Sequence, residues 1–348
     1  MILPENLPNT SFKEVAIIIL NWNGKTYLQQ FLPSVLAATY PNKRIILADN
    51  ASTDKSVFFV QQNFSEVEVI VNKQNDGFAG GYNWACSVIQ SDYYVLLNSD
   101  VEVEAGWLEP IIALMEANQK IAACQPKILQ YAARHSFEYA GASGGWIDQF
   151  GYPFARGRIF HECETDKGQY EKASKCFWAT GAAMVIKATA YHEAGGLDEL
   201  FFAHQEEIDL CWTLQELGYE VWVQPASVVY HVGGGTLPKS SVQKIYLNFR
   251  NNLAMLYKHL PIANLIWIMP IRVFLDAVAA YRELFKGNGA QFIAIARAHF
   301  SFTKWVFTKK LRKKNRNRGT SLDGFYKGSI VLDYFVKGKK TFTEILNS

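Results

Sequence analysis

The stretch that decides the fold runs from residue 93 to residue 102 and reads Tyr-Tyr-Val-Leu-Leu-Asn-Ser-Asp-Val-Glu. Its first five residues are apolar and rich in β-formers, and polar residues follow at Asn98, which predicts a buried strand that ends there. In open α/β sheets, ligands bind beyond the carboxyl ends of the strands, so Asp100 is expected near a ligand. Two interpretations are open: Asp100 holds a divalent cation against a diphosphate, or it caps a following helix.

Strand-like and helix-like segments alternate on the N-terminal side of this stretch. Residues 15–20 are an apolar run, 44–48 is a second strand-like segment that begins with Arg44, and 67–71 is a shorter one. Residues 25–38 and 82–90 are typical of helices. This alternation predicts a mostly parallel, doubly wound central sheet flanked by helices, as in Rossmann-like folds.

Polar loops follow these strands. Asp49 ends the second strand, where an acidic side chain can hydrogen-bond ribose hydroxyls, and Asp76 precedes a glycine-rich loop that lets the backbone approach a ligand. The carboxyl ends of parallel strands meet at one edge of a sheet, so we expect these loops to form one site. The alternative for each loop alone is a helix cap or an ordinary turn.

Four segments carry a family resemblance: VAIIILNWNG (15–24), ADNASTD (48–54), NDGFAGGYN (75–83) and LLNSDVEV (96–103). In order and spacing they resemble the nucleotide-binding half of family-2 glycosyltransferases with a GT-A fold, in particular the rhamnosyltransferase-like branch. The resemblance implies that Asp49 contacts the nucleoside, that Asp76 lies near the base or ribose, and that residues 98–100 take the place of an Asp-x-Asp element. The expected donor-binding residues are Asn21, Asn23, Asp49, Asn50, Asp76, Gly77, Gly80, Asn98 and Arg158.

The metal element departs from the family pattern, because Asn98 stands where the first Asp is usual. Asn is still an oxygen ligand, and Mg²⁺ keeps several waters, so Mg²⁺ or Mn²⁺ remains the expected cofactor. His231 ends a strand-like run before Gly233-Gly234-Gly235, which fits either a metal ligand or a structural histidine. The resemblance favours the ligand, and the expected metal-binding pair is Asp100 and His231.

The middle of the chain, residues 130–175, mixes glycines with aromatics and is expected to form a loop that shapes a sugar pocket. Arg156 or Arg158 could reach a diphosphate there, and the alternative is a surface hairpin with solvated arginines. The strand-like segment 177–186 resembles the family segment beside the acceptor. This makes Trp178 and Gly181 acceptor-site candidates, with a core tryptophan as the alternative.

The catalytic base is expected on a helix over residues 206–217. Helical spacing puts Glu207 on one stripe with apolar side chains such as Leu210 and Leu214, whereas Glu206 and Asp209 fall on a polar stripe as first-turn acids. The stretch resembles the Glu-Asp motif of the family, whose second member is the general base. That member is Glu207, Asp209 is the runner-up, and Glu206 is expected in the acceptor site.

The bulk properties indicate a folded enzyme. The 348 residues carry a net charge of +3 with 49% hydrophobic residues, and the five scattered cysteines favour reduced thiols in the cytoplasm. The N-terminus lacks the pattern of a signal peptide. The most apolar stretch, 262–280, contains Arg272 and Asp276, which argues against a membrane-spanning helix.

The C-terminal region is basic. Residues 284–322 include ten Lys or Arg and no acid, and eight of the ten fall within 304–318 beside apolar, helix-compatible segments. This pattern favours an anionic membrane surface over a solvated tail, and nucleic acid is not expected.

Together these features predict a catalytic domain over residues 1–255, with a nucleotide-sugar half (13–105) and an acceptor half (106–255), and a helical basic region over 256–348. The predicted activity is inverting, metal-dependent transfer of a sugar from a nucleotide-diphosphate donor to a glycan or polyprenyl-linked acceptor in cell-surface polysaccharide synthesis. The protein would be cytoplasmic, on the inner face of the membrane. A nucleotidyltransferase and a nucleotide-sugar-binding pseudoenzyme are the alternatives.

Overall fold

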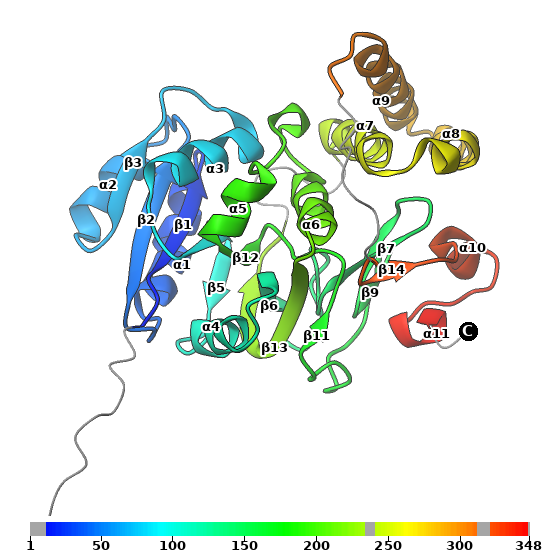
Figure 1. The fold of residues 1–348 in the computed structure, drawn as a ribbon. Coiled ribbons are helices and arrows are strands. Elements are labelled where there is room, and N and C mark those ends of the chain that lie inside the picture. Colours follow the sequence, from blue (N-terminus) through cyan, green and yellow to red (C-terminus); the bar gives the residue numbers. More distant parts are fainter. Residues whose placement is uncertain (1–11, 234–240, 312–320, 347–348) are drawn as a thin grey trace, which may run out of the picture.

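The computed structural model describes residues 12–233, 241–311 and 321–346. Figure 1 shows a central sheet with helices on both faces, a smaller sheet beside it, and a group of helices at one end. Three segments named above lie wholly or partly outside the described residues: the N-terminus (1–11), the glycines at 234–235 and the basic run after residue 311.

The central sheet confirms the expected doubly wound plan. Its longer strands are β1 (Val15–Asn21), β2 (Lys43–Asp49), β3 (Glu68–Val71), β4 (Tyr93–Asn98), β6 (Ile121–Gln130), β12 (Ala183–Lys187) and β13 (Glu220–His231). They lie in the order β13-β6-β12-β4-β1-β2-β3, with β11 (Ser174–Lys175) beyond β13 and β5 (Val101–Val103) paired with β13 off that path. Only β12 among the longer strands runs against the others.

Helices bury both faces of this sheet. Val15, Ile17 and Ile19 of β1 pack on one face, and Ala16 and Ile18 pack on the other. The first face carries α1 (Lys25–Leu36), α2 (Ser56–Asn63) and α4 (Leu108–Ala117), and the second carries α3 (Gly77–Val88), α5 (Ala188–Ala194) and α6 (Glu206–Glu216). Double burial explains why β1 is apolar throughout.

Some boundaries differ from the sequence expectation. Helix α3 begins at Gly77 rather than at residue 82, because Gly80 and Gly81 lie within the helix and pack closely: a Cβ on Gly81 would lie 2.7 Å from Leu20 Cδ1. The strand expected over 177–186 begins only at Ala183, as β12. The strand-like run that ends at His231 belongs to one long strand, β13, which has a register shift between Gln224 and Val228.

The middle of the chain contains a small sheet that the sequence did not reveal. It comprises β10 (Glu162–Cys163), β9 (Arg158–Ile159), β8 (Pro153–Ala155), β7 (Gly145–Asp148) and β14 (Phe325–Tyr326), in that order. The surface-hairpin alternative for the arginines is wrong, since both are buried. Arg156 donates to the Lys172 carbonyl, and the Arg158 guanidinium lies 4.7 Å from the centre of the Tyr139 ring.

The C-terminal third is mostly helical, as expected. Helices α7 (Val242–His259), α8 (Ile262–Phe285) and α9 (Gly289–Phe307) pack together at one end of the molecule (Figure 1). Helices α10 (Ile330–Phe335) and α11 (Phe342–Leu346) pack on the small sheet. By length and composition α8 could cross a membrane, although its sequence includes Arg272 and Asp276, and 22% of its apolar window is buried. All five cysteines are free, and four are buried.

Candidate functional site

Strand pairing brings Asp100 against His231. β5 follows Asp100 directly and pairs antiparallel with the end of β13, so that Val101 lies opposite His231. The Val232 N–H donates to the Asp100 carbonyl (3.1 Å), and Asp100 Oδ1 lies 3.2 Å from His231 Nε2. Both side chains are buried. The helix-cap interpretation of Asp100 is therefore wrong, because the residue lies in a turn between two strands.

Glu138 completes this cluster, and sequence reasoning missed it. Its Oε2 lies 3.2 Å from His231 Nδ1, on the opposite side of the ring from Asp100. The close approach of Glu138 requires a glycine at 233: φ is +72°, and a Cβ would lie 2.6 Å from Glu138 Oε1. Burial lowers the pKa of His231, but the two carboxylates outweigh it and raise the pKa to about 10. A lone Glu in an irregular segment carries no periodic signal that could have revealed this contact.

One carboxylate oxygen and one imidazole nitrogen could hold a divalent cation, provided that the cation displaces the proton that the two carboxylates favour on His231. Asp100 Oδ1 and His231 Nε2 face each other, and a carboxylate on the far ring nitrogen is the usual support of a metal-binding histidine. Among the described residues, no group of three His, Cys, Asp or Glu side chains is placed to hold a metal. The protein would therefore supply two ligands, and diphosphate oxygens and water would supply the rest. Asn98 ends β4, where its N–H donates to the Ala182 carbonyl (3.0 Å).

The ends of β1 and β2 form a tight polar junction. Asn21 Nδ2 donates to Asp49 Oδ1 (2.7 Å), and the Ser52 N–H donates to Asp49 Oδ2 (2.9 Å). Asn23 has a positive φ of 54°, and its Oδ1 accepts from the Thr53 N–H (2.7 Å). The structure thus brings Asn21, Asn23 and Asp49 together, and their expected role in nucleoside binding remains a prediction.

Asn50 and the start of α3 lie beside this junction, at the same edge of the central sheet. Asn50 Nδ2 donates to Asn75 Oδ1 and to the Gly77 carbonyl, both at 2.9 Å. Asp76 is half-buried, and a Cβ on Gly80 would lie 2.7 Å from the Asp76 Cβ. Gly77 has a φ of +73° and lies against Phe202. The start of α3 is therefore held directly against the loop that leads to α6.

Two adjacent carboxyl groups begin α6. Glu206, which helical spacing put on the polar stripe, is buried, whereas Glu207, which spacing put with the apolar side chains, is only half-buried. Burial raises the pKa of Glu206 well above its usual range, with Glu207 as a further cause. Burial also raises the pKa of Glu207, to about 6, while backbone N–H groups and Lys244 oppose the rise. A Cβ on Gly181 would lie 3.7 Å from the Glu207 Cβ, so these two predicted site residues are neighbours.

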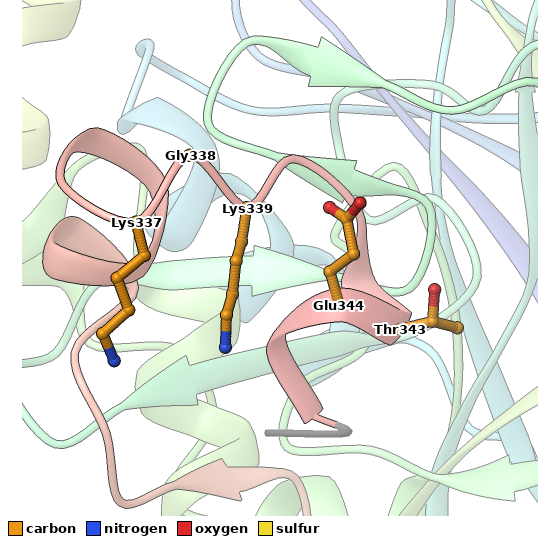
Figure 2. A pocket seen from close by; sticks show the side chains of 5 residues that line it. All are labelled: Lys337, Gly338, Lys339, Thr343 and Glu344. Carbon is orange, nitrogen blue, oxygen red and sulfur yellow. The ribbon is translucent and has the colours of Figure 1, made fainter.

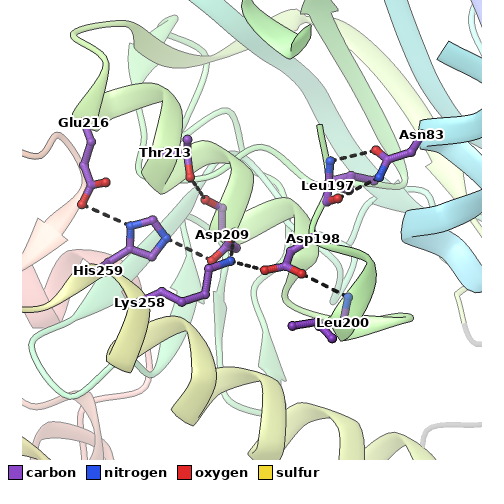
Figure 3. A network of polar contacts seen from close by, with 9 residues as sticks. All are labelled: Asn83, Leu197, Asp198, Leu200, Asp209, Thr213, Glu216, Lys258 and His259. Carbon is purple, nitrogen blue, oxygen red and sulfur yellow. Dashed lines mark hydrogen bonds and ion pairs between the residues drawn. The ribbon is translucent and has the colours of Figure 1, made fainter. Parts of the chain in front are cut away.

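Asp209, the runner-up for the base, belongs to a buried ionic network (Figure 3). Its Oδ2 accepts from Lys258 Nζ (2.7 Å), and its Oδ1 lies 3.0 Å from His259 Nε2. Lys258 also contacts Asp198 (2.5 Å), and His259 Nδ1 lies 3.1 Å from Glu216 Oε1. The acid-bearing face of α6 is therefore the one that packs on α7. Sequence periodicity separated the two faces of α6 but could not tell that α7 covers the polar one.

The sequence Arg250-Asn251-Asn252 on α7 holds the loop before α6. Asn251 Nδ2 lies 2.8–3.0 Å from the carbonyl oxygens of Phe201, Ala203 and His204. Asn252 Nδ2 lies 3.1 Å from Gln205 Oε1. The loop includes left-handed residues at 202, 204 and 205, and these contacts hold that conformation.

Two further candidates, Trp178 and Arg158, make contacts within the protein. Trp178 is a core residue, with its Nε1 donating to the Trp146 carbonyl (2.9 Å). Arg158 belongs to the small sheet, where Nη1 is 3.4 Å from the Pro153 carbonyl. The hollow in Figure 2 is lined by residues 337–339, 343 and 344 around α10 and α11, and it includes none of the predicted site residues.

Comparisons with known proteins agree with this geometry. Residues 16–191, just over half of the chain, match the family described as Glycosyl transferase family 2. The pre-mycofactocin glycosyltransferase of Mycobacterium tuberculosis is 26% identical over 227 residues, covering 64% of this chain and 43% of that protein. The N-acetylglucosaminyl-diphospho-decaprenol L-rhamnosyltransferase of the same organism is 22% identical over 237 residues, covering 63% and 76%. The chain thus spans less than half the length of the first of these relatives.

Solved structures share the fold. The crystal structure of GalNAc-T7 with UDP, GalNAc and Mn²⁺ aligns with a TM-score of 0.57 at 13% identity, covering 89% of this chain and 60% of that chain. The mannosyltransferase PcManGT from Pyrobaculum calidifontis, in complex with GDP-Man and Mn²⁺, aligns with a TM-score of 0.50 at 13% identity, covering 86% and 80%. The strand-end motifs, the central sheet and the family match lead to one conclusion: this chain belongs to glycosyltransferase family 2 and has a GT-A fold.

Proposed function

We propose that this protein is an inverting glycosyltransferase that moves a sugar from a nucleotide-diphosphate donor to a hydroxyl group of a glycan or polyprenyl-linked acceptor. One observation carries the proposal. Glu207 is a half-buried carboxyl group with a raised pKa, at the start of a helix whose preceding loop contacts the start of α3. Such a group is suited to accept a proton near neutral pH.

In the proposed reaction the acceptor hydroxyl attacks the anomeric carbon as the bond to the diphosphate breaks. Glu207 accepts the hydroxyl proton, and the left-handed loop held by Asn251 fixes the position of that carboxylate. Burial and the neighbouring Glu207 raise the pKa of Glu206, which favours a proton on Glu206 and disfavours a second negative charge beside Glu207. A bound Mg²⁺ or Mn²⁺, held by Asp100 and His231, would stabilise the charge on the leaving diphosphate.

The relatives support the substrate class. One named relative acts on a diphospho-decaprenol acceptor, and two solved neighbours contain a nucleoside diphosphate or a nucleotide sugar together with Mn²⁺. By analogy we assign a nucleotide-sugar donor, a lipid-linked or glycan acceptor, and a cytoplasmic location at the inner face of the membrane. The pseudoenzyme alternative rests on Asn98, which leaves one carboxylate in the metal element.

A donor screen tests the proposal. Thermal unfolding is measured with a panel of sugar nucleotides, each with and without Mn²⁺, and any stabilising donor is then assayed for release of its nucleoside diphosphate. Metal-dependent stabilisation and turnover by one donor are expected. Stabilisation without turnover, with or without a lipid-linked acceptor, would favour the pseudoenzyme, and no stabilisation by any donor would refute the donor class.

A further inference from the structure

Helix α8 buries its central charged residues and exposes large apolar side chains, the reverse of a helix on the surface of a water-soluble domain. Its buried residues, at helical spacing, are Ile268, Arg272, Asp276 and Ala280. The stripe opposite them, here called the outward stripe, consists of exposed Trp267, Phe274, Val278, Tyr281 and Phe285. Phe274 is 66% exposed and Phe285 is 86% exposed. The helix thus directs its central charges toward the protein and its large apolar side chains outward.

The two buried charges are fully engaged within the protein. Arg272 Nε donates to Asp276 Oδ1 (3.0 Å), and His299 of α9 lies 3.1 Å from Asp276 Oδ2. Arg272 Nη1 donates to the Phe150 carbonyl (2.8 Å), and the Tyr152 hydroxyl donates to Asp276 Oδ1 (3.1 Å). These charges argued in the sequence against a membrane-spanning helix, but they do not prevent contact with a lipid surface, because both are among the buried residues of α8.

Helix α9 packs against α8 and carries exposed apolar and basic side chains of its own. Ile293, Phe300 and Phe307 are exposed at seven-residue spacing, which keeps them on one side of the helix. Arg297 and Lys304 are exposed and lie three or four positions from these apolar residues, hence on the same side. The sequence from 284 to 310 contains no acidic residue, so this surface is complementary to an anionic partner.

We propose that the outward stripe of α8 and the basic, apolar side of α9 dock on an anionic phospholipid bilayer, with α8 lying in the plane of the membrane surface. Apolar side chains flanked by Lys and Arg are the composition of such interfacial helices, and Trp267 and Tyr281 suit the headgroup level. The middle of α8 is tied to Phe150 and Tyr152 of the small-sheet region. A helix whose middle is packed on a water-soluble domain cannot also cross the hydrocarbon core.

The same contacts fix the membrane face relative to the reaction site. Arg272 donates to Asn252 Oδ1 (2.5 Å), and Asn252 contacts Gln205, the residue before Glu206. A chain of buried polar contacts thus joins α8 to the start of α6. The docking proposal itself concerns only binding to lipid, and it does not depend on the donor, the acceptor or the activity proposed above.

Vesicle cosedimentation of the full chain, without donor or acceptor, tests the proposal. We expect binding to phosphatidylcholine vesicles that contain phosphatidylglycerol and much weaker binding to phosphatidylcholine alone. The double variant Phe274→Asp, Val278→Asp is expected to lose at least about tenfold in vesicle affinity. Exchanging Arg297 and Lys304 for Gln should weaken binding by about tenfold or more, for anionic vesicles only.

Phe58→Asp is the matched control, because Phe58 on α2 is 63% exposed and lies outside this surface. Its vesicle binding should equal that of the wild type. If the double variant does not fold, fluorescence quenching of the wild-type protein by brominated lipid still tests the proposal. Brominated phosphatidylglycerol should quench the tryptophan fluorescence of the wild type, and quenching should fall in Trp267→Phe.

Three results would overturn the proposal. The first is the absence of wild-type binding to anionic vesicles. The second is equal binding by the wild type and a folded Phe274→Asp, Val278→Asp variant. The third is a dimer in sedimentation equilibrium that the same variant abolishes, since a second copy of the chain would then be the partner of the outward stripe.

Discussion

Replacing Glu207 with Gln should abolish transfer while making the protein more stable at neutral pH. The side chain keeps its shape but can no longer accept a proton from the acceptor. A positioned general base contributes roughly 10²–10⁴-fold to the rate, so kcat should fall by that factor. Donor affinity should change little, because the expected donor-binding residues lie at the ends of β1, β2 and β4 and at the start of α3.

The gain in stability follows from the pKa of Glu207. Burial raises it from 4.5 to about 6, and each pKa unit corresponds to about 1.4 kcal/mol. The folded protein holds this proton more tightly than the unfolded chain, so wild-type stability falls as the pH rises from 4.5 toward 6 and stays lower above it. The Gln variant does not titrate there. We therefore expect a gain of about 2 kcal/mol near pH 7.5 and almost none near pH 4.

Urea unfolding near pH 4 and pH 7.5, followed by tryptophan fluorescence, measures this difference, and release of nucleoside diphosphate measures turnover. The wild-type kcat/KM should also fall about tenfold per pH unit below about pH 6, where Glu207 takes up a proton in the presence of Glu206 and Lys244. Glu66→Gln is the control, because it removes an exposed carboxylate. Full turnover in Glu207→Gln, or a loss of stability near pH 7.5, would refute the assignment.

Three further substitutions test the surroundings of Glu207. Asp209→Asn should lower the free energy of unfolding by about 3–5 kcal/mol in urea titrations, because it weakens a buried contact with Lys258; lost turnover at unchanged stability would instead mark Asp209 as the base. Asp100→Ala should remove the Mn²⁺-dependent gain in donor affinity measured by calorimetry, and an unchanged metal titration would contradict its role as a ligand. Asn251→Ala should cost about 1–3 kcal/mol in urea titrations, because buried carbonyl groups lose their donor, and kcat should fall with it; an unaltered kcat would show that the loop keeps its shape without Asn251.

Local pattern was sufficient to predict the nucleotide half of the fold. The apolar runs ending at Asn21, Asp49 and Asn98 are strands β1, β2 and β4, and their polar ends meet at one edge of the sheet. A strand buried on both faces must be apolar along its whole length, and the sequence displays that requirement directly. The candidate pair of Asp100 and His231 was named from their positions at strand ends together with the family resemblance, which favoured His231 as a ligand over a structural histidine.

Other features could not be read from the sequence, because they depend on which element covers a given face. Periodicity grouped Glu206 with Asp209 but could not show that both residues would be buried, or that Lys258 of α7 would bind Asp209. The small sheet consists of strands of two to four residues, too short to produce a periodic signal, and one of them comes from the end of the chain.

The sequence by itself therefore determined the doubly wound sheet, the edge where the loops gather and the family, because these follow from periodicity and from motifs within short segments. Only the tertiary structure decided that Glu138 supports His231, that Asp209 is held by Lys258, and that α8 turns Arg272 and Asp276 inward. Each of these contacts joins residues from different elements of the chain. Their energies depend on burial and distance, which appear only when the elements have packed.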